Sequence, residues 1–431
     1  MQHIVIIGNG IAGVTVARNI RKLSQDKITI VSSESKYFFS RTALMYVFMG
    51  HMKFNHLYPY ENFFWKKNRI NLLQNEVIEV KANQKLIVFK DKSSLSYDKL
   101  VIATGSKSNK FGWKNQEANG VIGLYHKQDL EKLEQLAKNC KHAVVVGGGL
   151  IGIELVEMLI SRKISVTFLV REKTFWGTIL PKGESEMITR HILEHHIDLR
   201  LETALDEVII DENGNAIAIK TDKGEIINCT IVGLTVGVSP NIDLLKNSEI
   251  KTNRGVIVNR FLETSAQDVY AIGDCAEQEI AIGNRRSIEA VWYTGKMMGE
   301  ALAQTLVGKA MKYNPGHWFN SAKFLDIEYQ TYGWVFAKPL ENEEQFYWEH
   351  KLGKMAVRIS FDKNNFNFLG INTFGIRMRH EFFDTVLNEK KSVQFVMDNL
   401  KRANFDPEFF KHYEKEIQAA FESKYSFSKV N

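Results

Sequence analysis

An α/β fold built from two parallel-sheet units, followed by a separate α+β domain, is predicted by three features of this 431-residue sequence. First, the spacing Gly-x-Gly-x-x-Gly occurs at residues 8–13 and again at 147–152, each time between an apolar run and a helix-like run. Second, short apolar strands alternate with helical patterns up to residue 306. Third, alternating aromatic strands and then helices follow from about residue 311. The first two features are typical of Rossmann-like domains that bind dinucleotides, and the third indicates an α+β domain.

The first unit begins with the apolar strand His3–Ile7, which leads directly into the turn from Gly8 to Gly13. In such a turn the first glycine allows a tight bend, the second lets the backbone approach a pyrophosphate, and the third lets the helix pack on the strand. The phosphates are expected at the positive end of the helix. A second apolar strand, Ile28–Val31, ends shortly before Glu34, where a carboxylate can accept hydrogen bonds from a ribose. Solvation of the strand end is the alternative role of Glu34.

The middle of the chain leads from this unit into a second one. A segment rich in Tyr, Phe and Met covers residues 37–65, and residues 99–106 form a strand that ends in a turn of small residues. The second unit has its first strand at Ala143–Val146, followed by the turn Gly147–Gly152 and a second strand at Val166–Val170. The sequence thus repeats the same strand, glycine turn and helix.

The remaining elements follow from the same patterns. A turn at residues 237–241 precedes a return strand at Val269–Ile272, and a helix is expected from about Glu289 to Leu306. In the carboxyl-terminal part, alternation of aromatic residues predicts strands at 324–336, 346–348 and 355–361, and helices from about residue 380 onward.

Composition and charge exclude several classes of protein. Hydrophobic residues make up 44% and charged residues 25%, as in ordinary globular proteins, and the net charge of +6 is spread along the chain. This charge favours acidic partners weakly, and no motif for nucleic-acid binding accompanies it. The first strand begins at residue 3, which argues against a signal peptide, and no uncharged apolar run is long enough to cross a membrane. The three cysteines form no Cys-x-x-Cys pair, so we expect a cytoplasmic protein with no bound metal.

Four motifs in this order resemble the signatures of the pyridine-nucleotide–disulfide oxidoreductase superfamily. Gly8–Gly13 with Glu34 is similar to its FAD loop, Tyr97–Ser106 to its crossover signature, Gly147–Gly152 to its NAD(P)H loop, and Ala271–Ala276 to its second FAD signature. The resemblance covers roughly residues 1–306 and implies a glutathione-reductase-like fold with FAD and NAD(P)H as cofactors. It implies an FAD-binding domain at 1–110 and 241–308, an NAD(P)H-binding domain at 111–240, and a carboxyl-terminal domain for interface or acceptor at 309–431.

The resemblance also implies which residues contact FAD. Arg41 matches the FAD-contacting arginine of the ferredoxin- and rubredoxin-reductase-like branch, although Thr42 replaces that branch's proline. Asp274 matches the aspartate that binds the ribityl chain. Trp292 lies at the start of the helix expected to direct backbone donors at the flavin, and simple packing is its alternative role. The implied FAD set is Gly8, Gly10, Ile11, Ala12, Gly13, Glu34, Arg41, Val77, Ala103, Thr104, Gly105, Gly273, Asp274 and Trp292.

The second loop leaves the choice of nicotinamide open. Glu154, expected in the first turn of the helix, is the candidate catalytic residue beside the nicotinamide, and its alternative role is interaction with the helix dipole. NAD-specific enzymes usually have an acidic residue at the end of the second strand, where this chain has Val170. Arg171 suits a 2′-phosphate and favours NADPH, whereas Glu172 suits the 2′-hydroxyl of NADH. The implied NAD(P)H set is Gly147, Gly149, Leu150, Ile151, Gly152, Arg171, Glu172 and Gly237.

The reaction implied by the resemblance is hydride transfer from NAD(P)H to flavin N5, followed by release of electrons to an external acceptor. That acceptor is expected to be a ferredoxin- or rubredoxin-like protein or a small molecule. No cysteine lies in residues 1–139, so the chain lacks the redox cysteines of the disulfide branches. Two other functions stay open: a membrane-associated quinone reductase that resembles type II NADH dehydrogenases, and a redox-sensing protein that binds FAD and NAD(H). A homodimer is also left open.

Overall fold

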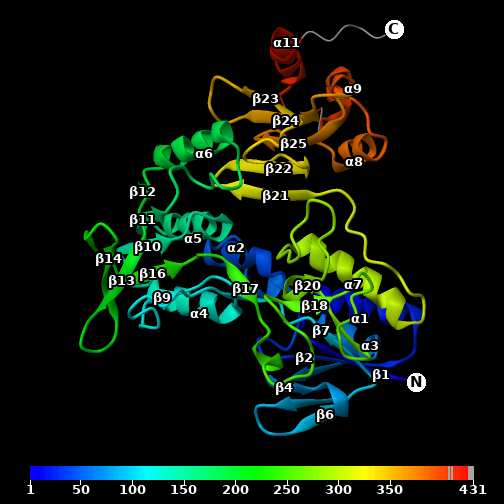
Figure 1. Ribbon diagram of the computed structural model, residues 1–431. Coiled ribbons are helices and arrows are strands. Elements are labelled where there is room, and N and C mark those ends of the chain that lie inside the picture. The colour runs from blue at the N-terminus through cyan, green and yellow to red at the C-terminus, as the bar shows by residue number, and fades with distance from the viewer. Residues whose placement is uncertain (406–407, 409–410, 426–431) are drawn as a thin grey trace. The chain divides into compact units, whose positions relative to one another are not determined.

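The computed structural model describes residues 1–405, 408 and 411–425 (Figure 1). The chain divides into two compact units. Unit 1 consists of Met1–Gly112, Ile122–Asn139 and Val236–Pro315, and unit 2 of Trp113–Val121, Cys140–Thr235 and Gly316–Asn431. The predicted α/β architecture with an α+β carboxyl-terminal part is confirmed. The finer division into three domains stays a prediction.

Unit 1 is built on a parallel sheet of five strands in the order β19-β7-β1-β2-β3. The central strand β1 (His3–Ile7) pairs with β7 (Lys99–Ile102) on one side and with β2 (Lys27–Ser32) on the other. The outer strands are β19 (Val269–Ala271) and β3 (Ile70–Gln74). These strands are rich in buried Ile and Val because helices and loops cover both faces of a parallel sheet. The order of the strands reverses beside β1, and ligands of such sheets bind at the carboxyl ends of the strands there.

Two helices of unit 1 pack closely against each other, α1 (Ile11–Leu23) and α7 (Trp292–Leu306). Gly299 allows the close approach, because a Cβ atom there would lie 2.8 Å from the carbonyl oxygen of Ala12. The predicted start of α7 at Glu289 is wrong by three residues. Val291 is extended (φ −133°, ψ 133°) and precedes the helix as its N-cap.

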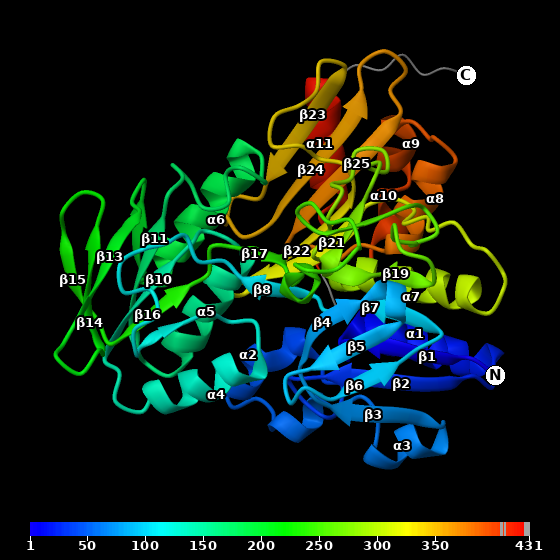
Figure 2. The ribbon, with the colours of Figure 1, turned by 60° about the horizontal axis from the view of Figure 1, so that its bottom comes forward.

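The smaller elements of unit 1 include an antiparallel sheet, β4-β5-β6, next to the parallel sheet (Figure 2). Buried residues of β4 and β5 belong to the same hydrophobic core as β1, β2 and β7. The further helices and strands are η1 (Arg41–Ala43), α2 (Leu44–Phe48), η2 (Phe54–Leu57), α3 (Asn62–Lys67), β4 (Val77–Lys81), η3 (Ala82–Gln84), β5 (Leu86–Phe89), β6 (Ser94–Ser96), β8 (Ser106–Ser108), α4 (Lys127–Leu136), β17 (Val238–Pro240), η4 (Asp243–Leu245), β18 (Val256–Val258), η5 (Gly273–Cys275) and β20 (Ala276–Gln278).

Unit 2 contains a second sheet, in which the parallel strands lie in the order β12-β11-β10-β16. The short strand β9 (Val121–Ile122) lies at the edge of this sheet. Its central strand β10 (His142–Val146) lies between β11 (Ser165–Val170) and β16 (Ile231–Leu234). The strand order reverses beside β10, as it does beside β1 in unit 1. The remaining elements of this part are α5 (Leu150–Ser161), α6 (Lys182–Glu194), β12 (Asp198–Leu201), and the antiparallel strands β13 (Leu205–Ile210), β14 (Ala216–Thr221) and β15 (Ile226–Asn228).

The carboxyl-terminal part of unit 2 is an antiparallel sheet in the order β21-β22-β25-β24-β23, with helices packed on it. Its strands are β21 (Phe319–Phe324), β22 (Ile327–Gly333), β23 (Glu343–Glu349), β24 (Ala356–Asp362) and β25 (Phe368–Phe374), and its helices are α8 (His380–Asn388), α9 (Val393–Asp398), α10 (Leu400–Ala403) and α11 (Glu414–Lys424).

Two predictions about this sheet are wrong in detail. The strand predicted at 324–336 is interrupted, because the chain reverses at Leu325 and Asp326 between β21 and β22. The strand β25 is missed, since Gly370 interrupts its apolar alternation. The tertiary structure explains this glycine: a Cβ atom at Gly370 would lie 2.5 Å from the backbone nitrogen of Trp334.

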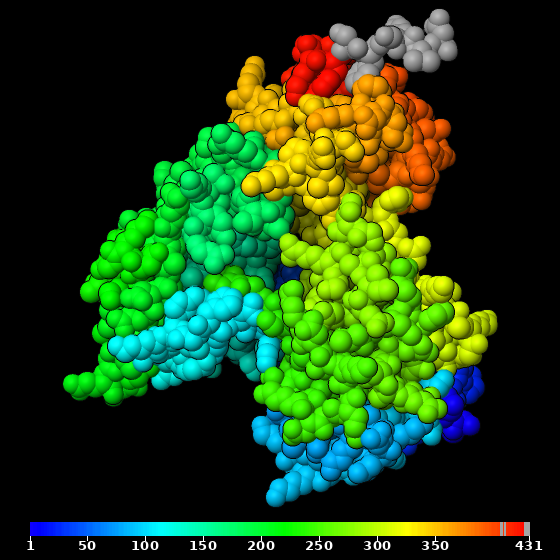
Figure 3. Space-filling view, in the orientation of Figure 1, coloured from blue at the N-terminus to red at the C-terminus, as the bar shows by residue number. Residues whose placement is uncertain are grey.

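Charged contacts join α5 and α6 to the carboxyl-terminal sheet within unit 2. Glu184 of α6 is fully buried and forms an ion pair with Arg358 of β24 at 2.7 Å. Figure 3 shows the green surface of α6 next to the yellow and orange surface of these strands. Two further ion pairs are Glu157–Lys323 at 2.6 Å and Arg190–Glu349 at 2.5 Å.

Candidate dinucleotide-binding sites

The first glycine loop is a tight turn at the carboxyl end of β1. Gly8 has φ +114°, a conformation that side chains strongly disfavour, and a Cβ atom there would lie 2.0 Å from the carbonyl oxygen of Ala103. The Gly8 amide donates to the carbonyl of Val31 at 2.8 Å, which ties the loop to β2. At Gly13 a Cβ atom would lie 2.0 Å from the carbonyl oxygen of Gly8. The first and third glycines are therefore required by contacts inside the protein.

Gly10 differs from its two neighbours in the loop. Its φ of −71° suits any residue, and a Cβ atom there would meet no described heavy atom within 4 Å. Gly10 is also the N-cap of α1, and no described side chain caps the amides of this helix end. Open space above the positive end of a helix is what a pyrophosphate requires. The loop therefore fits the phosphates of a dinucleotide.

Glu34 and Arg41, both predicted to contact FAD, are paired with each other. The two guanidinium nitrogens of Arg41 donate to the two carboxylate oxygens of Glu34 at 2.9 and 2.5 Å. The backbone amide of Lys127 at the start of α4 also donates to Glu34 at 2.8 Å. Burial opposes ionisation of Glu34, but hydrogen bonds from His126 and Arg41 and the charge of Arg41 outweigh it and lower its pKa to about 2. Glu34 is therefore a carboxylate, the form that accepts hydrogen bonds from ribose hydroxyls.

Asp274 lies at the carboxyl end of β19, in a hydrogen-bonded network. The hydroxyl of Ser106 donates to its carboxylate at 3.1 Å, and the hydroxyl of Tyr125 lies 3.4 Å from the same oxygen. The backbone amide of Ser106 donates to the Tyr125 hydroxyl at 2.9 Å. Burial raises the pKa of Asp274, although the Ser106 hydrogen bond and the charge of Arg41 oppose the rise. This network holds Asp274 in a single orientation.

Tyr125 is the main residue of this region that the sequence did not indicate. Its carbonyl oxygen accepts a hydrogen bond from Arg41, whose guanidinium carbon lies 4.6 Å from the centre of its ring. Its hydroxyl lies near Gly105, where a Cβ atom would be 2.9 Å away from it. Tyr125 thus joins Arg41 to Asp274. No motif contains it, and it lies two residues before α4 begins at Lys127.

Several of the remaining predicted FAD residues follow β7 and β19 at the same end of the sheet. Ala103, Thr104 and Gly105 follow β7, and the Thr104 hydroxyl donates to the carbonyl of Asn241 at 2.6 Å. Gly273 has φ +74° and packs toward α1, since a Cβ atom there would lie 3.1 Å from the Cβ of Ala12. Val77 begins β4, three residues after the parallel strand β3 ends at Gln74.

Trp292 is the first residue of α7 and is 38% exposed. Its ring makes an edge-to-face contact with the ring of Tyr293, with centroids 5.5 Å apart. Val291, the N-cap residue of α7, makes no side-chain capping hydrogen bond. The positive end of the helix dipole favours a group that carries negative charge there.

The second glycine loop, in unit 2, repeats the geometry of the first. Gly147 has φ +116°, and a Cβ atom at Gly152 would lie 2.1 Å from the Gly147 carbonyl oxygen. A Cβ atom at Gly149, the N-cap of α5, would meet no described heavy atom within 4 Å. Thr235, which the sequence analysis does not single out, donates from its hydroxyl to the carbonyl of Val146 at 2.8 Å. The loop therefore fits a second dinucleotide through Gly149 and the first amides of α5, Leu150 and Ile151 among them.

Hydrogen bonds of the two glycine loops show which residue after β11 corresponds to Glu34 after β2. The Gly8 amide donates to Val31, and the Gly147 amide donates in the same way to Leu169 at 3.0 Å. Glu34 is the third residue after Val31, and Glu172 is the third residue after Leu169. Glu172 therefore corresponds to Glu34, and it lies two residues after Val170, the last residue of β11. Its side chain is 26% exposed, whereas that of Arg171 is 83% exposed.

Glu154 lies in the second turn of α5, which corrects the expectation of a place in the first turn. The helix begins at Leu150, and its described first turn contains no acidic residue. Interaction with the helix dipole, which is strongest in the first turn, is therefore a poor explanation of Glu154. Burial and the nearby Glu157 raise the pKa of Glu154 to about 7. The side chain can therefore be neutral or charged near neutral pH.

Gly237 belongs to unit 1, whereas the other predicted NAD(P)H residues belong to unit 2. It has φ +89°, and its carbonyl accepts a hydrogen bond from the amide of Asn109 at 3.0 Å. The sequence motif alone did not indicate this difference.

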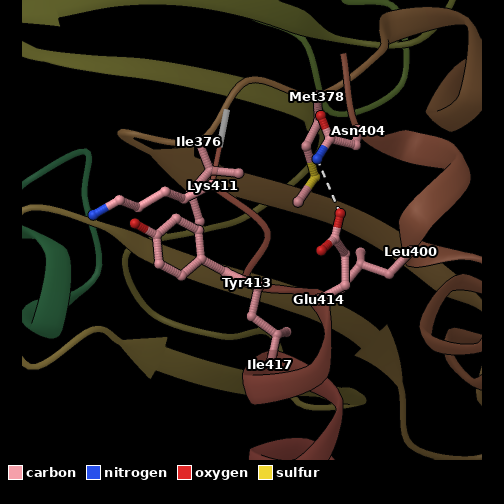
Figure 4. A pocket seen from close by; sticks show the side chains of 8 residues that line it. All are labelled: Ile376, Met378, Leu400, Asn404, Lys411, Tyr413, Glu414 and Ile417. Carbon is pink, nitrogen blue, oxygen red and sulfur yellow. Dashed lines mark hydrogen bonds between the residues drawn. The ribbon is translucent and has the colours of Figure 1, made fainter. Parts of the chain in front are cut away.

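A small pocket lies in the carboxyl-terminal part of unit 2 (Figure 4). It is lined mainly by apolar side chains, and Asn404 donates to Glu414 across it at 2.9 Å. No residue of either glycine loop lines this pocket, so we assign it no part in dinucleotide binding. Among the described residues, we find no helix that is both long and apolar enough to cross a membrane.

Comparison with known proteins identifies the family. A family model described as pyridine nucleotide-disulphide oxidoreductase matches residues 2–299. The chain is 32% identical over 279 residues to the NADH-rubredoxin oxidoreductase of Clostridium acetobutylicum, covering 64% of this chain and 68% of that protein. It is 29% identical over 310 residues to the assimilatory nitrate reductase electron transfer subunit of Bacillus subtilis, covering 71% of this chain.

The chain spans only 39% of the length of the Bacillus subtilis subunit. Among solved structures, the NAD-dependent persulfide reductase from A. fulgidus has a TM-score of 0.84 at 19% identity, covering 98% of this chain and 83% of that one. At this identity the structural likeness supports the fold. Together with the family match, it shows that the chain belongs to the pyridine nucleotide-disulphide oxidoreductase family of flavoproteins that use FAD and NAD(P)H.

Proposed function

We propose that this protein is an FAD-dependent NADH oxidoreductase that passes electrons to a rubredoxin- or ferredoxin-type protein. The main support is the matched geometry of the two glycine loops. In each loop the third glycine is closed against the first, and the second is open above the start of a helix. Two such loops in one chain suit one resident dinucleotide and one that exchanges.

FAD is assigned to the loop in unit 1. Gly10 and the first amides of α1 would hold its pyrophosphate, and the ionised Glu34 would accept hydrogen bonds from its adenosine ribose. Arg41 keeps Glu34 in place and neutralises its charge. Asp274 would accept from hydroxyls of the ribityl chain. Its orientation is set by Ser106 and Tyr125, so the cofactor meets a carboxylate that is already positioned.

When bound, FAD would supply the redox chemistry, namely hydride acceptance from the nicotinamide and electron release to the acceptor. The protein contributes binding and electrostatics. The positive end of α7 would stabilise a group that gains negative charge. The three cysteines are buried, and burial raises the pKa of Cys229 to about 12 and also raises that of Cys275. Such thiols are poor nucleophiles, which agrees with electron release that bypasses a cysteine pair.

NADH is proposed over NADPH because of Glu172. It lies two residues after the end of β11, as Glu34 lies two residues after the end of β2. A carboxylate there accepts from a 2′-hydroxyl but repels a 2′-phosphate. Arg171, which favours NADPH, extends into solvent with its side chain 83% exposed. The name of the Clostridium acetobutylicum relative, an NADH-rubredoxin oxidoreductase, supports the same choice.

The name of the Clostridium acetobutylicum relative and the positive charge of this chain support a rubredoxin- or ferredoxin-type acceptor. The net charge of +6 suits an acidic partner, since opposite charges speed the encounter of two proteins. The cytoplasm is the proposed location, since the three cysteines are unpaired.

The test is flavin reduction followed over time in a stopped-flow instrument, with NADH and NADPH in turn, and then reoxidation by rubredoxin, ferredoxin and a soluble quinone. We expect faster reduction by NADH and fast reoxidation by one of the two proteins, slowing as salt is added. Faster reduction by NADPH would refute the nicotinamide assignment. Fast reoxidation by the quinone alone would refute the acceptor assignment, and failure of both nucleotides to reduce the flavin would refute the whole proposal.

A further inference from the structure

Two histidines and an aspartate meet at one point of unit 2, away from both glycine loops in the sequence. His191 of α6 and His195 at its C-cap lie one helical turn apart, and each directs its Nε2 atom toward the same oxygen, Oδ1 of Asp326. The distance from the His195 nitrogen is 3.2 Å, and His191 forms a hydrogen bond with that oxygen. One ligand atom from each residue lies within 4.8 Å of the others.

One of the distances already has the value that a zinc ion demands. Zinc bonds to imidazole nitrogen and carboxylate oxygen are about 2.0–2.2 Å long, so tetrahedral ligand atoms lie roughly 3.3 Å apart. The His195–Asp326 distance of 3.2 Å already has this value. His191 and Asp326 need to move apart slightly, and the Asp326 side chain, 57% exposed, has room to turn. Three protein ligands would leave the fourth position to water.

The surroundings suit the metal-bound form of His191. Binding through Nε2 requires the ring proton to be on Nδ1, and a metal-bound histidine usually donates that proton to a carboxylate. Nδ1 of His191 is buried and has no hydrogen-bond partner among the described residues. The carboxylate of Glu194 lies 3.6 Å away on the same helix. Lys354 approaches the other oxygen of Asp326, Oδ2, at 3.5 Å, which leaves Oδ1 to the histidines.

The turn that carries Asp326 is held firmly. Strands β21 and β22 are joined by Leu325 and Asp326 alone. Leu325 has φ +57°, a conformation that non-glycine residues disfavour, and it is only 3% exposed. Burial of the leucine side chain therefore keeps the turn in this strained conformation. Asp326 is presented to α6 by a preorganised turn, as metal sites require.

We propose that His191, His195 and Asp326 form a site for a zinc-class divalent ion that joins α6 to the β21–β22 turn. The expectation of no bound metal rests on the cysteines alone, which have no metal-ligand spacing. Asp326 lies 131 residues after His195, so the third ligand is supplied by the tertiary structure. The ion would add to the contact that Glu184 and Arg358 make between the same helix and sheet.

The test uses the full-length FAD-loaded protein after treatment with a chelator. Zinc binding is measured by competition with a chromophoric chelator, and cobalt is added separately because tetrahedral cobalt absorbs strongly in the visible range. The variants are Asp326→Asn and His195→Gln, both at exposed positions. The matched control is His196→Asn, which removes the adjacent exposed imidazole and keeps a residue that tolerates the φ of +57° at this position.

We expect the parent and His196→Asn proteins to bind one more equivalent of zinc than the two site variants, or to bind it at least about tenfold more tightly. Zinc should also raise the melting temperature of the parent and the control but not of the site variants. FAD content and circular dichroism verify that each variant is folded. Equal zinc binding by all four proteins, or site variants that lose only thermal stability, would show a hydrogen-bonded ion pair without a metal and overturn the proposal.

Discussion

Alanine substitutions at Gly10 and at Gly13, only three residues apart, should impair different properties of the protein. Both changes add one methyl group to the loop at the end of β1. At Gly13 the new Cβ atom would lie 2.0 Å from the carbonyl oxygen of Gly8, and backbone atoms cannot move aside as a side chain can. At Gly10 it would meet no described heavy atom within 4 Å, and the φ of −71° suits alanine. Gly13→Ala should therefore damage the fold, and Gly10→Ala should damage only FAD binding.

The two effects differ in size as well as in kind. Ordinary van der Waals contact begins at 3.4 Å, so the overlap at Gly13 exceeds 1 Å. Overpacking costs typically about 1–3 kcal/mol and more where nothing can yield, against a gain of about 1 kcal/mol for alanine in a helix. We expect a net loss of roughly 2 kcal/mol or more. At Gly10 the methyl group would displace a phosphate from one or two amides, and each lost hydrogen bond costs about 1.5–3 kcal/mol. The FAD Kd should therefore rise by roughly 10- to 10,000-fold.

Thermal unfolding of the apoprotein and titration with FAD separate the two outcomes. Gly10→Ala should melt as the parent does and bind FAD weakly, whereas Gly13→Ala should melt at a lower temperature. If Gly10→Ala binds FAD as tightly as the parent, the assignment of the pyrophosphate to this loop is wrong. If Gly13→Ala is as stable as the parent, the contact with Gly8 does not constrain the loop.

Three further predictions concern unit 2. Glu172→Gln should raise KM for NADH several-fold and leave FAD content unchanged, whereas Arg171→Ala should change KM little. Steady-state kinetics measure both values. Equal effects of the two substitutions would contradict the equivalence of Glu172 with Glu34. The folded protein holds a proton on Glu154 more tightly than the unfolded chain, because burial raises the pKa from 4.5 to about 7. Stability should therefore fall as pH rises from about 4.5 to 7, and Glu154→Gln should remove that part of the fall in thermal unfolding. Arg358→Met should cost about 3–5 kcal/mol in denaturant unfolding by leaving Glu184 unpaired, and adding Glu184→Leu should recover most of it.

Much of the fold could be predicted because its signals are local. The strands β1 and β10 are apolar runs that lead into glycine turns, and β2 and β11 are apolar runs that follow the next helix. The clash that excludes a side chain at Gly13 involves Gly8, only five residues earlier. The missed strand β25 lacks such a signal. Its glycine at 370 is explained by the backbone of Trp334, which no local pattern contains.

The residues of the candidate sites show the same difference between local signals and contacts that are distant in the sequence. Glu34, Arg41 and Asp274 could be named from motifs, but the ion pair of Glu34 with Arg41 could not. Tyr125 was missed because its contacts to Arg41 and Asp274 join segments far apart in the chain. Glu172 was named without a decision between nucleotides, since the equivalence with Glu34 depends on the register of β10 and β11.

The sequence by itself determined that this chain has two dinucleotide loops and which family it resembles, because glycine spacing and apolar runs act over a few residues. The tertiary structure alone decided which side chains meet. It paired Glu34 with Arg41, placed Tyr125 against Asp274, and brought Asp326 to His191. Contacts of this kind depend on how whole elements pack, and packing leaves no periodic trace in the residues that take part.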